Sequence, residues 1–156
     1  MEDRHTGKIL ALCISEKKGT LKTEINEANF IEDFGIENDA HAGKWHRQVS
    51  LLEFNKIDEF RKKGANVDFG AFGENIVLEG IELHTLPIGQ LIKIGDVLLE
   101  VTQIGKKCHD KCQIYYQVGE CIMPKNGIFT KVLKGGKVKV GDECSLVKSD
   151  KMVINL

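Results

Sequence analysis

Three runs of apolar residues, set between polar and glycine-containing segments, dominate the pattern along the chain. They are GKILALCIS at 7–15, RQVSLLEF at 47–54 and FGENIVLEGIEL at 72–83. Short apolar runs bounded by turn-forming residues are typical of buried β-strands rather than amphipathic helices. We therefore predict a strand in each run.

A second pattern, an apolar run interrupted by Gly-Asp, predicts a β-hairpin within residues 86–105. In IKIGDVLLEV (92–101) the glycine takes the first central position of the turn, where a positive φ favours it. The segment VKVGDECSLV at 138–147 repeats the pattern. We expect the same hairpin chemistry at both places, since two copies are too few for a solenoid.

Two short helices and one long polar segment complete the pattern. The first helix is predicted to begin at an Asn55 cap and end at Gly64, and the second to span 110–119 with Asp110 as its cap. Residues 23–46 are polar and lack a helical period, so we expect extended chain leading into a functional loop. Many short strands and recurrent glycine turns indicate a compact β-barrel or curled sheet.

Composition narrows the class of protein. A chain of 156 residues suits one domain, expected over residues 1–150 with a tail at 151–156. The formal net charge of −1 does not match the basic footprint of a nucleic-acid-binding protein. No apolar run approaches the roughly 20 residues of a membrane span, and the run at 9–14 is too short for a signal peptide. We expect a cytoplasmic protein that binds neither nucleic acid nor membrane.

The five cysteines divide into two kinds. An odd number in a reducing cytoplasm favours free thiols over disulfides, and Cys13 and Cys144 lie in apolar strand patterns typical of the core. Cys108 instead lies in GKKCHDKC (105–112), among three lysines and just before the second predicted helix. The helix dipole and these charges favour its thiolate, the form that attacks sulfur, carries a persulfide or binds a soft metal.

Other readings of the same cysteines remain open. Cys108, Cys112 and Cys121 could together bind zinc or an iron–sulfur cluster, although the paired C-x2-C spacing of zinc ribbons is absent. Cys112 could act as a resolving thiol for Cys108 or pack as an ordinary helix residue. The residues favour a reactive Cys108 over a structural metal site.

A second polar group lies in GIENDAHAGKWHRQVSLL at 35–52. Its candidate binding residues are Asp39, His41, Lys44, Arg47 and Gln48. Lysine and arginine side chains suit a phosphate or another oxyanion, whereas the glycine-rich motifs of ordinary nucleotide sites are absent. The alternative is a solvated surface loop. Glu74 and Asn75, in the turn before the third strand, could cap a loop or face the same pocket.

Three segments taken in order, GIENDAHAGKWHRQVSLL, FGENIVLEGI and PIGQLIKIGDVLLEVTQIGKKC, closely resemble the MOSC domain. This domain forms the C-terminal part of molybdenum cofactor sulfurases and also occurs as separate bacterial proteins. The resemblance extends over residues 7–147, nearly the whole chain. It implies a mainly β (α+β) fold, a distorted closed β-barrel with a few short helices.

The resemblance also implies which residues form the site. The family's hallmark cysteine follows the LEVTQ strand, and that position is Cys108 here. It is implied to accept sulfane sulfur or to ligate molybdenum, and is thus both the catalytic and the metal-binding candidate. The cofactor-binding residues that we expect from the matched motifs and the neighbouring lysine are Asp39, His41, Lys44, Arg47, Gln48, Ser50 and Asn75.

The implied function lies in molybdenum cofactor metabolism. Cys108 would carry sulfane sulfur, as in a sulfur transferase, or bind the non-covalent molybdopterin cofactor directly. The expected partners are a pyridoxal-phosphate cysteine desulfurase as sulfur donor and a molybdoenzyme or cofactor-synthesis protein. The chain length leaves no room for the additional N-terminal β domain of MOSC-containing reductases, so we expect an accessory protein. The competing hypothesis is a small protein with a structural zinc or iron–sulfur site at Cys108, Cys112 and Cys121.

Overall fold

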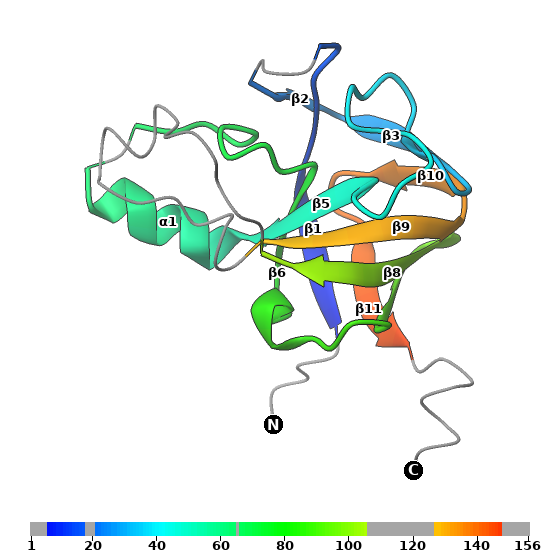
Figure 1. Ribbon diagram of the computed structural model, residues 1–156. Helices are drawn as coiled ribbons and strands as arrows, with labels where there is room; N and C mark the ends of the chain where they lie inside the picture. Colours follow the sequence, from blue (N-terminus) through cyan, green and yellow to red (C-terminus); the bar gives the residue numbers. More distant parts are fainter. Residues whose placement is uncertain (1–5, 18–20, 65, 106–126, 148–156) are drawn as a thin grey trace.

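The computed structural model describes residues 6–17, 21–64, 66–105 and 127–147, and these form a curled β-structure with one α-helix (Figure 1). The elements are β1 (Thr6–Ile14), β2 (Thr23–Ile25), β3 (Glu27–Ile31), β4 (Gly35–Ile36), β5 (Val49–Glu53), α1 (Phe54–Lys62), β6 (Ile76–Glu79), the 3-10 helix η1 (Leu83–Thr85), β7 (Leu91–Ile94), β8 (Val97–Ile104), β9 (Ile128–Lys134), β10 (Gly136–Lys139) and β11 (Glu143–Val147).

Seven of these strands close into a barrel. Their order is β11-β7-β8-β9-β5-β6-β1, and β11 then pairs with β1 again to complete the circle. The closing register places Gly7 opposite Cys144. All neighbouring pairs are antiparallel except β5 and β6, which run parallel and are connected through α1. Strand β2 pairs antiparallel with the last residues of β1. Strands β10, β3 and β4 form a separate three-stranded sheet. The expected mainly β, closed-barrel fold is confirmed.

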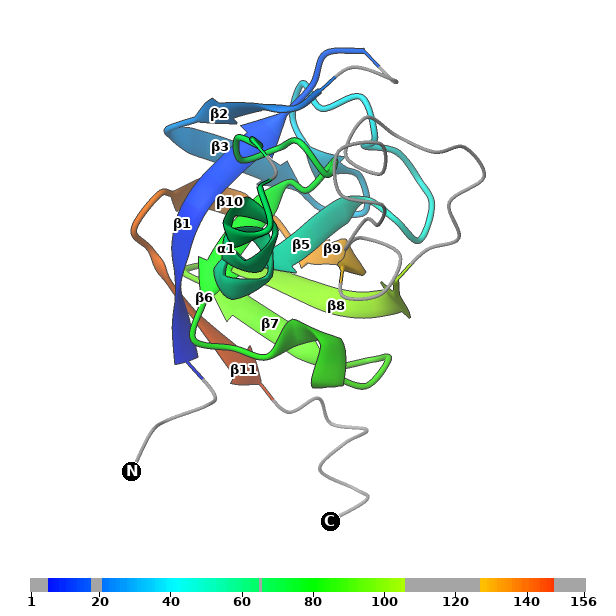
Figure 2. The same ribbon diagram turned by 90° about the vertical axis from the view of Figure 1, so that its left-hand side faces the viewer.

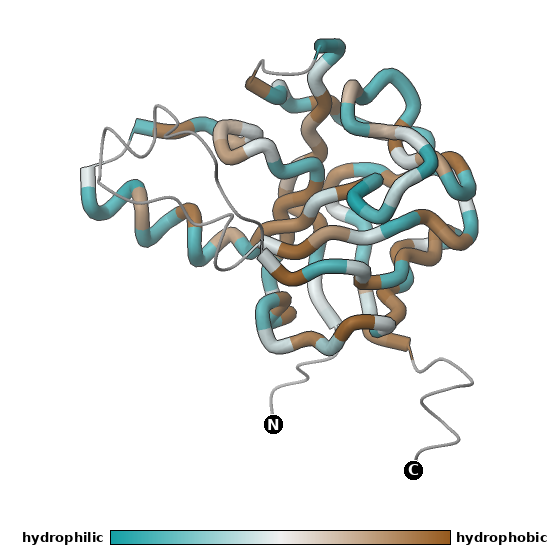
Figure 3. Tube along the Cα trace, in the orientation of Figure 1, coloured by the Kyte–Doolittle hydropathy of each residue, from teal (hydrophilic) through white to brown (hydrophobic). Residues whose placement is uncertain are grey.

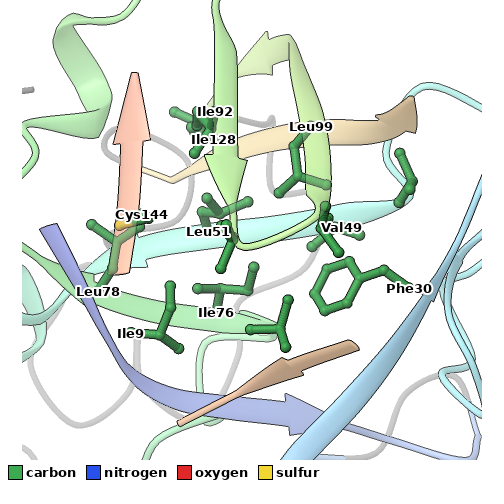
Figure 4. Close-up of a cluster of buried hydrophobic side chains, with 14 of the residues drawn as sticks. Ile9, Phe30, Val49, Leu51, Ile76, Leu78, Ile92, Leu99, Ile128 and Cys144 are labelled. Carbon is green, nitrogen blue, oxygen red and sulfur yellow. The ribbon is translucent and has the colours of Figure 1, made fainter. Parts of the chain in front are cut away.

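The long apolar runs reflect strands that are buried on both faces. In β5, Val49 and Leu51 belong to the cluster inside the barrel (Figure 4), whereas Leu52 packs in a second cluster with Ile57 and Phe60 of α1. Alternation along a strand sends successive side chains to opposite faces, so both faces of β5 need apolar residues. Figure 2 shows α1 lying over the β5–β6 part of the barrel wall.

Strand β1 follows the same rule with one irregularity. Ile9 and Leu12 belong to the cluster inside the barrel, and Ala11 and Cys13 to the cluster under α1. The pairing with β6 shifts register between Ile9 and Ala11, and this bulge explains the odd spacing of the inward side chains. Cys13 and Cys144 are both buried, which confirms their prediction as core residues. Brown, hydrophobic segments accordingly mark the barrel strands in Figure 3.

The hairpin predicted within 86–105 is confirmed. Strands β7 and β8 pair antiparallel with Ile94 opposite Val97, and Gly95 between them has a φ of 59°. Only the two residues Gly95 and Asp96 connect the strands, so the glycine supplies the positive φ that a tight hairpin turn needs.

The second predicted hairpin is wrong. Strand β10 pairs with β3, whereas β11 pairs with β1 and β7. The connecting residues bond to β1 instead of closing a ladder: the Gly141 amide donates to the Ile9 carbonyl (2.8 Å), and the Ile9 amide donates to the Asp142 carbonyl (2.9 Å). The Gly-Asp pattern predicted a turn correctly, but β11 pairs with β1 and β7 instead of with β10, so the two strands do not form a hairpin.

The first helix begins earlier than predicted. Its N-cap is Glu53 rather than Asn55, and no side-chain bond caps it. The Glu53 carboxylate accepts a hydrogen bond from the Leu83 amide (2.7 Å), so it serves η1 instead. The helix ends at Lys62, with Gly64 two residues on at a φ of 100°, as expected for a glycine stop. The second predicted helix, at 110–119, lies outside the described residues. Within the described ranges, no helix is long and apolar enough to cross a membrane.

Candidate functional site

A buried lysine occupies the centre of a polar network that lies between the end of β1 and the start of β2. Lys22 immediately precedes β2, and only 1% of its side chain is exposed. Its Nζ lies 2.7 Å from Asp39 Oδ1, 2.9 Å from His41 Nδ1 and 3.3 Å from Ser15 Oγ. Because a buried ammonium is costly unless it is paired and hydrogen-bonded, these three contacts account for its position.

The Asp39 carboxylate is enclosed by protein donors. Oδ1 accepts hydrogen bonds from Lys22 and from the Ser15 amide (3.1 Å), and Oδ2 accepts one from Asn75 Nδ2 (3.1 Å). None of the Asp39 side chain is exposed. Asp39 therefore holds together three segments of the chain and does not face solvent.

Asn75 connects this network to the barrel. Its Nδ2 also donates to the Cys13 carbonyl (3.0 Å), and its Oδ1 accepts a bond from the Ser50 amide (2.9 Å). The Ser50 hydroxyl accepts a bond from the Asn75 amide (3.1 Å) and lies 2.9 Å from the Gly73 carbonyl, to which it donates. The structure thus brings together four of the predicted site residues. We call the set Ser15, Lys22, Asp39, His41, Ser50 and Asn75 the Lys22 network.

Arg47 lies next to this network with an unused donor. Its guanidinium carbon is 4.6 Å from the centroid of the Trp45 ring and 5.6 Å from that of Phe129. Arg47 Nε is buried and has no hydrogen-bond partner among the described residues. Trp45 Nε1 donates to the His41 carbonyl (2.8 Å), so Trp45 connects Arg47 to the network. A stacked guanidinium with an unpaired buried N–H is suited to an anionic ligand.

Two predicted binding residues lie apart from the Lys22 network. Gln48, which directly precedes β5, is fully buried. It accepts a bond from the Val132 amide of β9 (2.9 Å) and donates to the Asp33 carboxylate (3.1 Å), so it links β9 to the Asp33 side chain. Lys44 is exposed on the loop between β4 and β5.

Glu74 shapes the turn that carries Asn75. Its carboxylate accepts bonds from the Gly70 amide (2.9 Å) and the Phe72 amide (3.0 Å), and burial raises its pKa to about 7. Burial, reinforced by Glu74, raises the pKa of Cys13 to about 12. Burial likewise raises the pKa of Cys144 to about 11. Both of these cysteines therefore remain thiols at neutral pH.

Cys108, Cys112 and Cys121 lie outside the described residues. The described residues that flank their segment are hydrogen-bonded to each other, since the Gly105 amide donates to the Gly127 carbonyl (2.6 Å). Gln103 donates to the Gly105 carbonyl (2.7 Å), and its Oε1 lies 2.8 Å from His46 Nε2. Gly105 therefore lies close to Gln103, which contacts the loop of His46 and Arg47. Among the described residues, no group of three or more His, Cys, Asp or Glu side chains could hold a metal ion.

An open cavity of about 570 Å³ lies elsewhere, between β5, β6, η1 and β11. Its lining includes Glu53, Glu79 and Glu82 but none of the predicted site residues. Its acidic lining is unsuited to the anionic ligand that Arg47 favours.

Sequence reasoning missed Lys22 and Ser15. Lys22 and the exposed Lys17 both lie in the polar stretch of sequence that follows the first apolar run, and nothing in the local pattern separates the two lysines. The contacts of Lys22 with Asp39 and His41 form only when the chain folds back over seventeen to nineteen residues.

The sequence pattern of the MOSC domain matches residues 38–145, and the chain belongs to this family. Among solved structures, it is similar to the YuaD protein from Bacillus subtilis, with a TM-score of 0.77 and 21% identity over 94% of this chain and 98% of that one.

Two further relatives extend the comparison. YiiM from Geobacillus stearothermophilus has a TM-score of 0.67 and 19% identity, covering 91% of this chain and 75% of that one. A Gibberella moniliformis protein named "Reductase" is 28% identical over 155 residues, which cover 85% of this chain. The match spans only 28% of the length of that reductase.

Proposed function

We propose that this MOSC protein acts in molybdenum cofactor metabolism, holding the anionic cofactor at Arg47 and carrying sulfane sulfur on Cys108. The observation that carries the proposal is the buried, unpartnered Nε of Arg47, stacked on Trp45 beside the Lys22 network. Cys108 follows Gly105 by three residues, so chain length alone keeps its Cα within roughly 11 Å of the Gly105 Cα.

The residues present suit a phosphate-bearing pterin. Arg47 offers an unused N–H, and the exposed Lys44 on the same loop adds a second positive charge. When bound, the cofactor supplies a molybdenum centre that a thiolate can ligate. Asp39 and Asn75 hold the loop in place and do not bind the ligand themselves, because their polar atoms are hydrogen-bonded within the protein.

Sulfur transfer uses ordinary thiol chemistry. The Cys108 thiolate attacks the terminal sulfur of a persulfide on the donor desulfurase, a sulfur–sulfur bond forms on Cys108, and the donor's cysteine leaves as a thiolate. Release of that sulfur as sulfide takes two electrons, which a second thiol supplies by forming a disulfide with Cys108. Cys112 is the candidate for this second thiol within the chain.

Intact-mass measurement tests the sulfur step. After incubation with a cysteine desulfurase and cysteine, the wild-type chain should gain about 32 Da per sulfur atom, the mass of a persulfide adduct. Cys108→Ala should lose the adduct, whereas Cys144→Ala, which removes a buried thiol, should keep it. An unchanged adduct on Cys108→Ala would contradict the proposal.

Cofactor content tests the binding step. Protein purified from molybdate-fed cells should contain molybdenum and pterin, and Arg47→Gln should lose most of both. Arg61→Gln is the matched control, because Arg61 also stacks on an aromatic ring (4.8 Å from Phe69) but its Nε already donates to the Val67 carbonyl. Equal loss in the two variants would argue against a specific role for Arg47.

The competing structural-metal hypothesis gives a different result. If Cys108, Cys112 and Cys121 bind zinc, the protein should contain one zinc per chain and unfold when a chelator removes it. Zinc in that amount, with neither molybdenum nor a persulfide, would replace the proposed function.

A further inference from the structure

The cavity between β5, β6, η1 and β11 is a second candidate binding site. Its volume of about 570 Å³ is enough for a small organic molecule, and its apolar walls include Ile81, Leu86 and Leu146. Strand β2, which follows Lys22, and the end of β11 lie at opposite ends of the molecule (Figure 1, Figure 2). None of the lining residues belongs to the Lys22 network, so the cavity is separate from the site of the proposed function.

The charge of the lining is negative. Glu53, Glu79 and Glu82 contribute three carboxylates, and the described lining residues include no lysine, arginine or histidine. The beginning of α1 adds only about half a positive charge, which the carboxylates outweigh. Among the described residues, no group of three or more His, Cys, Asp or Glu side chains could hold a metal ion, so the carboxylates do not converge on one point. The lining therefore favours an organic cation that reaches separated acceptors.

Glu53 is a buried carboxylate with one unused oxygen. Only 5% of its side chain is exposed. Oε1 accepts a hydrogen bond from the Leu83 amide (2.7 Å) and lies 3.1 Å from His84 Nδ1. No described residue donates to Oε2, and the side chain does not cap α1. Because a buried carboxylate oxygen without a donor is costly, a ligand N–H at this oxygen would be stabilising.

Gln90 supplies a second unused acceptor in the same lining. The residue is 7% exposed, and its Nε2 donates to the Leu91 carbonyl (2.9 Å) and to the Val147 carbonyl (3.1 Å). Since both of these neighbours are carbonyl oxygens, the amide nitrogen must face them, and Oε1 has no donor among the described residues. The only fully buried side-chain N or O atom without a partner in the described chain is Arg47 Nε, so Glu53 Oε2 and Gln90 Oε1 are accessible to a ligand.

We propose that this cavity binds a small organic cation with several N–H donors on an apolar frame, such as an alkyl diammonium. Its ammonium groups donate to Glu53 Oε2 and Gln90 Oε1, and its alkyl part packs against the apolar walls. The exposed Glu79 and Glu82 add negative charge to the same lining. The ligand is a donor because both unused atoms are acceptors, and an anion would leave them without a partner.

Isothermal titration calorimetry of the full chain with cadaverine, an alkyl diammonium, tests the site. At about 0.15 M salt, which screens loose charge attraction, cadaverine should bind stoichiometrically. Pentanediol, the neutral analogue of the same length, should not bind. Magnesium chloride should not displace cadaverine, because the carboxylates do not form a metal site. Binding of pentanediol with equal affinity, displacement by magnesium or an absence of cadaverine binding would overturn the proposal.

Glu53→Gln tests the buried acceptor. The variant keeps one oxygen for the Leu83 amide and replaces the free oxygen by an N–H donor. Cadaverine binding should weaken at least about tenfold, the effect of losing a hydrogen bond to a charged group. The matched control is Glu59→Gln, which removes an exposed glutamate of α1 outside the lining and should bind cadaverine like wild type. Equal affinity in wild type and Glu53→Gln would contradict the role of Glu53.

Two further variants complete the test. If Glu53→Gln does not fold, Glu79→Gln combined with Glu82→Gln removes two exposed carboxylates of the lining and should weaken cadaverine binding at least about threefold. Unchanged affinity in that double variant would overturn the proposal. Arg47→Gln should bind cadaverine like wild type, because Arg47 does not line this cavity. A failure of the proposed function at Arg47 is thereby distinguished from a failure of the cation site.

Discussion

At the scale of single residues, Glu74 is a buried carboxylate that two backbone amides hold in place. Both of its oxygens accept an N–H from the turn at 70–74, and those bonds, with the charge of Lys22, lower its pKa less than burial raises it. The result is a pKa of about 7 against an ordinary value of 4.5. Glu74 therefore changes charge near neutral pH directly beside the Lys22 network.

This shift predicts a pH-dependent contribution to stability. Between pH 4.5 and pH 7 the native state binds a proton at Glu74 that the unfolded chain releases. The contribution of Glu74 to the free energy of unfolding therefore falls as the pH rises through this range. Glu74→Gln lacks this dependence. The stability of wild type relative to Glu74→Gln should drop by up to about 3 kcal/mol from pH 5 to pH 8, measured by urea unfolding.

The matched control is Glu59→Gln, which changes an exposed glutamate on α1. Its stability should follow the wild-type pH profile throughout. Parallel profiles for wild type and Glu74→Gln would show that Glu74 has an ordinary pKa in the folded protein.

At the scale of elements, the turn before β6 presses against the chain before β2. Gly70 has a φ of 94°, and a Cβ placed on it would lie 2.3 Å from the Lys22 carbonyl oxygen. Its amide donates to Glu74, which holds the turn in shape, and the close approach to the Lys22 carbonyl packs the turn against the Lys22 segment. The backbone of Lys22 thus depends on a glycine 48 residues further along the chain.

Gly70→Ala should therefore destabilise the protein by at least about 3 kcal/mol, from the strained φ and the clash together. It should also disturb the ¹⁵N signals of His41, because Lys22 must move. Gly64→Ala is the control: Gly64 has a similar φ of 100°, but no atom lies within 4 Å of its would-be Cβ. If urea unfolding gave equal decreases in the free energy of unfolding for the two variants, backbone strain alone, and not contact with Lys22, would explain the effect.

At the scale of the whole molecule, the closed barrel holds the site in place. The Lys22 network takes residues from the chain after β1, the chain before β2, the loop after β4, strand β5 and the turn before β6. These segments are adjacent only because β5, β6 and β1 are neighbours in the barrel. The packing of these strands thus brings the polar residues of the site together.

Leu99 tests the contribution of that interior. It is fully buried in the barrel cluster (Figure 4), so Leu99→Ala should cost about 2–5 kcal/mol of unfolding free energy. Ile88, in the loop before β7, is 61% exposed, and Ile88→Ala should change stability by less than about 0.5 kcal/mol. Urea unfolding of both variants measures the difference. Similar values would contradict the assignment of Leu99 to a tightly packed core.

Most strands could be predicted from the sequence because a buried strand consists of a local run of apolar residues. The runs containing Ile9, Leu51 and Leu99 are apolar whatever their partners, and Gly95 marks its own turn. Helix boundaries were less accurate: the N-cap is Glu53 rather than Asn55, and the Glu53 carboxylate bonds to the Leu83 amide, thirty residues away. The propensities of neighbouring residues cannot predict a contact between such distant positions.

The sequence by itself determined the β class, the family resemblance and four members of the polar network, because motif residues and apolar runs are properties of neighbouring positions. The tertiary structure alone decided which polar side chains meet. It joined Lys22 to Asp39 and His41, left Lys44 and Gln48 apart, and separated β10 from β11. These outcomes depend on contacts between distant segments, and such contacts exist only once the barrel has closed.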